Sequence, residues 1–90
     1  MEQPSFIKDP QAVLDYRWDW SAWLGADTIA TATITVPTGI TKDSQTNTTT
    51  AVTAWLSGGT VRTSYAVTCR IVTAAGRTDE RSITIVVAER

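Results

Sequence analysis

Four short stretches near the C-terminal end decide the fold: LSGGT at 56–60, SYAVTCRIVT at 64–73, AGRTD at 75–79 and RSITIVV at 81–87. The glycine pair of the first stretch predicts a turn, and the second stretch alternates apolar and polar residues with a period of two. The third stretch has the glycine of a tight hairpin tip, and the fourth alternates again. Together they predict two antiparallel strands that each bury one face.

Working outward from this hairpin, the rest of the chain has the same pattern of short alternating runs. Further strands are predicted over residues 14–20, 28–36 and 51–56, with glycine or proline turns between them. The polar, threonine-rich run 41–50 is predicted to be a loop or a short edge strand. Short strands at intervals of roughly 8–12 residues are typical of a sandwich or a barrel.

Tyr65 narrows the fold class further, because it stands near the start of the strand that enters the hairpin. A tyrosine there can form a tyrosine corner, in which its hydroxyl bonds to the backbone upstream. We therefore predict an all-β, immunoglobulin-like antiparallel β-sandwich of about seven strands over residues 13–90. Residues 1–12 are predicted to be an extended N-terminal arm, since Pro4 and Pro10 favour extended backbone. The residues predicted to face the core are Leu14, Tyr16, Trp18, Ala32, Ile34, Val52, Ala54, Tyr65, Val67, Cys69, Ile83 and Ile85.

Register decides which face each side chain takes, because a shift of one residue reverses a whole strand. In the strand that begins at Thr28, strict alternation places Ala30 and Ile34 on one face and Ile29 on the other. In residues 51–56 the same rule turns Trp55 outward, where an exposed tryptophan is a candidate anchor for a partner. A one-residue shift would bury Trp55 instead, and the sequence favours neither reading.

The remaining tryptophans and the cysteine have structural interpretations. Trp18 and Trp20 share the inner face of their strand and are predicted to form much of the core. Trp23 lies in a turn and is predicted to cap one end of the sandwich. Cys69 alternates with Val67 and is predicted to be a small core residue rather than a nucleophile.

The composition argues against several functions. The chain has 90 residues, a net charge of −1 and 19% charged residues, so no strong field attracts nucleic acid or an anionic membrane. No run approaches the roughly 20 apolar residues that span a bilayer. The sequence has no histidine and one cysteine, so the usual general base and an internal disulfide are missing. We expect one domain that is not an enzyme, with no catalytic residue, cofactor, metal site, nucleic-acid partner or membrane partner.

Two places are predicted to contact protein partners besides Trp55. The N-terminal arm has Phe6 and Ile7 as its one apolar pair, and these are expected to dock on a neighbouring subunit. The hairpin tip carries Arg77, Asp79 and Arg81, which are expected to give specificity at the rim of an interface.

The chain resembles the small fibre–tail adaptor proteins of tailed bacteriophages. The resemblance rests on FIKDP at 6–10, VLDYRWDW at 13–20, WLSGGT at 55–60 and GRTDERS at 76–82, in that order along the chain. It implies an immunoglobulin-like virion component, made in the bacterial host cytoplasm and present in several copies per particle. Its expected partners are phage tail, neck or fibre proteins, and it implies no catalytic residue.

Two other interpretations are left open. The first is a host-glycan-binding module, in which Trp55 and Trp23 would stack on sugar rings. The second is a capsid decoration protein, since small phage sandwiches also occupy that position. Both would use the same fold, so the fold class does not separate them from the adaptor.

Overall fold

The computed structural model describes residues 5–89, and within them nearly all regular structure is β-strand. One short helix interrupts the strands, and it spans a single turn. The all-β prediction is therefore confirmed. The elements in chain order are β1 (Ser5–Lys8), β2 (Leu14–Asp19), α1 (Ser21–Leu24), β3 (Ile29–Thr35), β4 (Ile40–Asn47), β5 (Ala51–Gly58), β6 (Thr63–Thr73) and β7 (Thr78–Val87).

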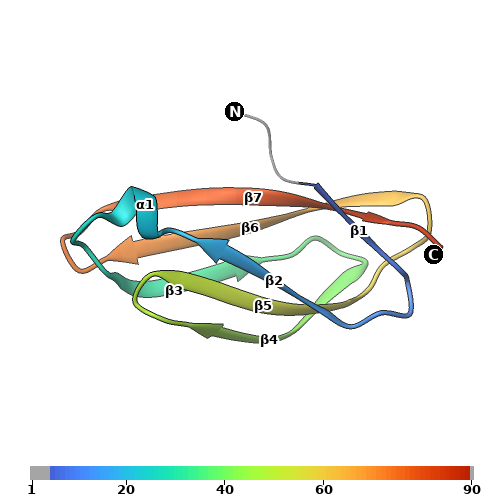
Figure 1. The fold of residues 1–90 in the computed structure, drawn as a ribbon. Helices are drawn as coiled ribbons and strands as arrows, with labels where there is room; N and C mark the ends of the chain where they lie inside the picture. Colours follow the sequence, from blue (N-terminus) through green and yellow to red (C-terminus); the bar gives the residue numbers. More distant parts are fainter. Residues whose placement is uncertain (1–4, 90) are drawn as a thin grey trace.

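The strands form two packed sheets, one of four strands in the order β1-β7-β6-β3 and one of three in the order β2-β5-β4. Figure 1 shows α1 and the β6–β7 turn at one end of the sandwich, with the C-terminal end of β7 at the other. Strands β2-β5-β4 and β7-β6-β3 follow the order B-E-D and G-F-C of an immunoglobulin domain. This order supports the immunoglobulin-like interpretation.

One strand pair departs from the antiparallel prediction. β1 runs parallel to β7, with Ser5 opposite Thr84 and Lys8 opposite Val87. The other paired strands are antiparallel. The parallel pair exists because the chain crosses from one sheet to the other after β1, so that β1 and β7 enter their sheet from the same end.

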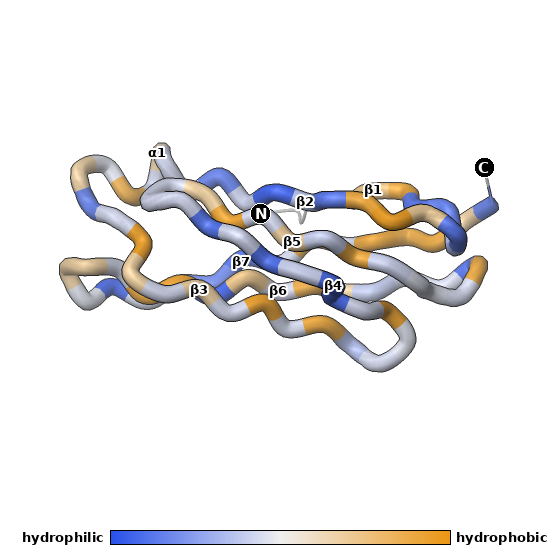
Figure 2. The backbone as a smooth tube through the Cα atoms, turned by 90° about the horizontal axis from the view of Figure 1, so that it is seen from below, coloured by the Kyte–Doolittle hydropathy of each residue, from blue (hydrophilic) through white to orange (hydrophobic). Residues whose placement is uncertain are grey.

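The core lies between the sheets and follows the predicted alternation, which Figure 2 shows as apolar and polar residues taking turns along the strands. Val67, Cys69, Ile83 and Ile85 face inward as predicted. The prediction that Leu14 faces the core is wrong. Its side chain is 38% exposed, because β2 is an edge strand and Leu14 is its first residue. Ala32 is only partly buried.

A β-bulge in β3 corrects the predicted faces at its start. The pairing with β6 shifts between Ile29 and Thr31, so Ala30 is an extra residue in the ladder. The extra residue reverses the alternation, and Ile29 is buried while Ala30 is exposed. Beyond the bulge Ile34 faces the core as expected.

Most of the polar run 41–50 belongs to an edge strand, β4, so the prediction of an edge strand is confirmed. Only residues 48–50 form a loop. β4 also has a bulge, between Lys42 and Ser44, which leaves Asp43 without a partner residue in β5. A bulge and a charged side chain on an edge strand both hinder pairing with another chain. The turn after β4 is closed by the Thr48 amide, which donates to the Ala51 carbonyl over 2.9 Å.

The expected arm is corrected over part of its length. Residues 5–8 form β1 and belong to the four-stranded sheet. The Phe6 ring packs edge-on against Tyr16 of β2, with 5.4 Å between ring centroids. This segment therefore packs on its own sandwich, and residues 1–4 of the predicted arm lie outside the described residues.

Candidate functional site

Trp55 lies at the centre of the outward face of the three-stranded sheet. Its neighbours Ala54 and Leu56 are fully buried, whereas Trp55 is 41% exposed, because alternation along β5 turns it away from the core. β5 is the middle strand of its sheet, so Trp55 has a strand on each side. Of the two readings of Trp55 from sequence, the structure has the exposed one.

Acidic residues flank Trp55. Asp15 of β2 lies directly opposite it on one side, and Ser44 of β4 lies opposite on the other. Asp43, in the bulge next to Ser44, accepts a hydrogen bond of 2.9 Å from the Ser57 hydroxyl. We call the surface formed by Trp55, Asp15, Asp43, Ser44 and Ser57 the Trp55 face.

Phe6 and Ile7 are the exposed apolar residues of β1, at the edge of the four-stranded sheet, and they point to opposite faces of the strand. Phe6 is 41% exposed despite its contact with Tyr16, and Ile7 is 55% exposed. Val13 and Leu14, at the start of β2, are exposed as well. The predicted docking of Phe6 and Ile7 on a neighbouring subunit stays a prediction.

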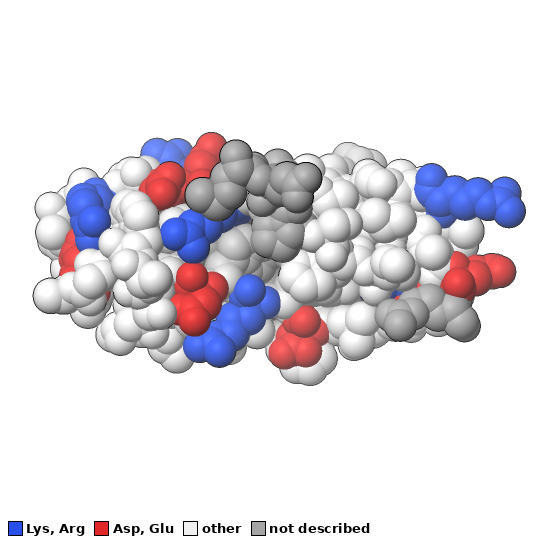
Figure 3. Space-filling model, turned by 45° about the horizontal axis from the view of Figure 1, so that its top comes forward, with Lys and Arg blue, Asp and Glu red and all other residues white. Residues whose placement is uncertain are grey.

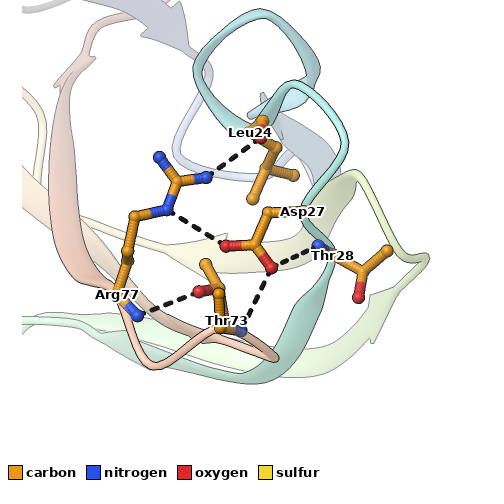
Figure 4. Close-up of polar contacts among 6 residues, drawn as sticks. Leu24, Asp27, Thr28, Thr73 and Arg77 are labelled. Atoms are coloured by element: carbon orange, nitrogen blue, oxygen red, sulfur yellow. Dashed lines mark hydrogen bonds and ion pairs between the residues drawn. The ribbon is translucent and has the colours of Figure 1, made fainter.

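Arg77 at the hairpin tip is held by its own chain, as Figure 4 shows. Its Nε forms an ion pair of 3.0 Å with Asp27 Oδ2, and its Nη2 donates to the Leu24 carbonyl over 2.9 Å. The guanidinium also lies over the Trp23 ring, 4.3 Å from its centroid. Arg77 thereby ties the hairpin tip to α1, and Trp23 caps this end of the sandwich as predicted.

Asp27 is the acceptor that organises this end, and the sequence analysis did not single it out. Hydrogen bonds from the Thr73 hydroxyl, the Thr28 amide, Arg77 and the Ala75 amide lower its pKa from 3.8 to about 2. Asp27 precedes a strand without a motif of its own, so a local signal for this role is missing. Apart from the adjacent Thr28, its partners come from a hairpin about fifty residues later.

Arg81 of β7 contacts the C-terminal end of β2, in the other sheet. Its guanidinium lies 4.2 Å from the centroid of the buried Trp20 ring, and its Nη1 donates to the Asp19 carbonyl over 3.2 Å. Asp79, two residues earlier, is partly buried. The predicted interface roles of Arg77, Asp79 and Arg81 stay predictions, and both guanidiniums already have partners within the chain.

Lys8 is a second residue that the sequence analysis did not identify. It is fully buried, and its Nζ donates to the Gly58 carbonyl over 2.7 Å and to the Asp9 carbonyl over 2.9 Å. Burial lowers the pKa of its ammonium group. Lys8 therefore joins β1 to the last residue of β5, in the other sheet.

Two predictions about single residues are confirmed. The Tyr65 hydroxyl accepts a 2.9 Å hydrogen bond from the Thr60 amide, which is a tyrosine corner. The turn that precedes it needs glycine, because a Cβ at Gly59 would lie 2.5 Å from Val87 Cγ2. Cys69 is fully buried, and burial raises the pKa of its thiol to about 11, as for an inert core residue.

The surface has no region dominated by one sign of charge on the side that Figure 3 shows. Basic and acidic groups lie next to one another over the half that contains α1, and a broad uncharged stretch separates them from the charged groups at the other end. Within residues 5–89, acidic and cysteine side chains form no group of three that could hold a metal ion. The helical structure in the same residues falls short of the length and hydropathy of a membrane span.

Comparison with known proteins places the chain in a family. The family model described as "Podophage GP4 fiber-tail adaptor protein gp77" matches residues 8–86, which covers every strand except most of β1 and the last residue of β7. A search of curated proteins found no match. With most of its length matched, and with an all-β fold that suits a small structural component, the chain belongs to the podophage GP4 fiber-tail adaptor family.

Proposed function

We propose that this chain is a virion component that joins the podophage tail or neck to fibre proteins through protein–protein contacts, in several copies per particle. Membership of a fiber-tail adaptor family supports a structural role in the tail. The observation that carries the contact surface is Trp55, a large ring exposed at the middle of an otherwise polar sheet face. Tryptophan is enriched among the residues that dominate binding energy.

The edge at β1 is the second proposed contact, with Phe6 and Ile7 as its apolar residues. It lies beside β7, in the sheet opposite to Trp55. Arg77, Asp79 and Arg81 are proposed to contribute at a rim, with smaller effects than Trp55 because both arginines already bind their own chain. An adaptor needs two surfaces, and these two lie on different sheets.

The glycan-binding alternative loses part of its support. It needs Trp23 as well as Trp55, and one face of the Trp23 ring is covered by Arg77. The capsid decoration alternative is disfavoured by a family description that refers to the tail and fibre. We propose that the chain is not an enzyme, and its membership of a structural adaptor family supports this.

The test is Trp55→Ala in the purified chain, assayed for binding to the tail and fibre proteins of the same phage. We expect normal folding by circular dichroism and a loss of binding on the order of 2 kcal/mol, roughly thirtyfold in Kd. Arg70→Ala is the matched control, because Arg70 is an exposed residue on a central strand of the other sheet. Unchanged binding by a folded Trp55→Ala variant would refute the proposed surface.

A further inference from the structure

The chain places an arginine over two of its four tryptophan rings. Arg77 lies over Trp23 and Arg81 over Trp20, at 4.3 Å and 4.2 Å from the ring centroids. In both cases the guanidinium also donates to an oxygen acceptor, the Asp27 carboxylate for Arg77 and the Asp19 carbonyl for Arg81. Figure 4 shows the acceptor side of the Arg77 arrangement.

Trp55 has the ring and the acceptors of this arrangement. Asp15 is its direct cross-strand neighbour, and such neighbours have Cβ atoms about 4.5–5.5 Å apart. On the opposite side, Asp43 is anchored by Ser57, which lies two residues beyond Trp55 on the same face of β5. The ring is thus bordered by a carboxylate from each adjacent strand.

The arginine is what the Trp55 face lacks. Within residues 5–89, neither Asp15 nor Asp43 forms a salt bridge, and the cation that acts on Asp43 is the buried Lys8 ammonium, which donates to the Gly58 and Asp9 carbonyls. The same residues place a guanidinium over Trp20 and Trp23 but not over Trp55. Arg17 is the basic residue on the outward side of β2, and it lies opposite Thr53 rather than Trp55.

The charge of the face favours a cationic occupant. Asp19 lies beside Arg81 at the far end of β2, and Lys8 near Asp43 is buried. The exposed charged side chains nearer to Trp55 are therefore Asp15, Arg17 and Asp43, two acidic groups and one basic group. A guanidinium stacks on an indole ring and bonds to a carboxylate with its planar edge at the same time. The ammonium group of lysine is not planar, so it cannot stack on a ring and present a planar edge to a carboxylate at the same time.

We propose that the Trp55 face receives an arginine side chain from the surface of a tail or fibre protein, stacked on Trp55 and bonded to Asp15 or Asp43. This inference rests on the proposed function, since it specifies the chemistry of the partner at the same surface. Within the chain, Arg77 and Arg81 each stack on a tryptophan ring and donate to an oxygen. The partner's arginine would make the same two contacts with Trp55 and a carboxylate, but between two proteins.

The first experiment uses small probes and does not need the partner. N-acetyl-arginine amide is titrated into the ¹⁵N-labelled chain, and the Trp55 indole N–H signal is followed by NMR. We expect saturable chemical-shift changes at Trp55, Asp15 and Asp43. The dissociation constant should be at least about fivefold lower than for N-acetyl-lysine amide. N-acetyl-citrulline amide, which has the same shape without charge, should give no saturable shift.

The matched variants are Asp15→Asn and Asp43→Asn together, which keep the shape of both side chains. We expect the pair to weaken arginine binding at least about fivefold, while Glu80→Gln, at an exposed residue of β7 in the other sheet, leaves it unchanged. Equal shifts with citrulline, unchanged binding in the double variant, or saturation by a monosaccharide instead of arginine would each overturn the inference.

A second experiment separates this inference from the proposed function. The double variant and Trp55→Ala are both assayed for binding to the tail and fibre proteins. Weakened binding in both variants supports the arginine site. If Trp55→Ala weakens binding and the double variant does not, the arginine site is refuted and the contact surface stands. If neither variant has an effect, the proposed surface itself is refuted.

Discussion

Asp27 illustrates how one side chain can organise an end of the sandwich. Its two carboxylate oxygens accept hydrogen bonds from the residue after it, from the hairpin tip and from Arg77. These donors favour the charged form, so its pKa falls to about 2. A group whose pKa is lower in the folded state contributes stability above its ordinary pKa of 3.8 and loses that contribution as the pH falls toward 2.

Asp27→Asn should therefore lower the melting temperature by several degrees at neutral pH, because Arg77 loses its charged partner. The difference between the variant and the original chain should shrink as the pH falls from 5 to 2. Thermal melts followed by circular dichroism measure both effects. Asp79→Asn on the same hairpin is the control and should melt like the original chain. A difference that stays constant with pH would contradict this account.

At the scale of the elements, edge strands behave differently from central ones. Leu14 and Leu56 lie directly opposite each other in the β2–β5 pair. Leu56 is fully buried because β5 is central, while Leu14 is 38% exposed because β2 is an edge strand. Two leucines with the same orientation thus have different environments, and the position of the strand in the sheet is the cause.

Truncating these two leucines separates the effect of burial from that of residue type. Leu56→Ala should cost about 2–5 kcal/mol of unfolding free energy, since it removes a fully buried side chain and leaves a cavity. Leu14→Ala should cost less than about 1 kcal/mol. Urea denaturation of both variants measures the difference. Similar losses in the two variants would show that the edge at β2 is covered in solution.

The whole molecule is thin for its length, with extents of 42 × 27 × 19 Å. Because the sandwich is thin, partners bound to its two sheets would be separated only by this one domain. A single domain can therefore lie between two partners. β1 closes one edge of the four-stranded sheet, and without it β7 would present unpaired backbone groups at residues 84–87. The segment is thus a structural part of the sandwich as well as a proposed contact.

Removing residues 1–8 should therefore lower the melting temperature and cause association that increases with protein concentration, because the edge of β7 becomes available for pairing. Light scattering coupled to size exclusion measures the association. The control is Phe6→Ser with Ile7→Ser, which changes the exposed side chains but keeps the backbone of β1. A truncated chain that stays monomeric with an unchanged melting temperature would show that β1 does not protect this edge.

The amino-acid sequence alone was enough to predict the sandwich and most of its core. These features depend on alternation within single strands and on local turn residues such as the glycine pair before Tyr65, which adjacent residues specify. Only the folded structure shows the outward direction of Trp55, the bulges at Ala30 and Asp43, the parallel pairing of β1, and the intramolecular partners of Arg77 and Arg81. Each of these depends on a segment far away in the chain, because a bulge, an edge pairing or an ion pair forms only where folding brings a second strand alongside the first.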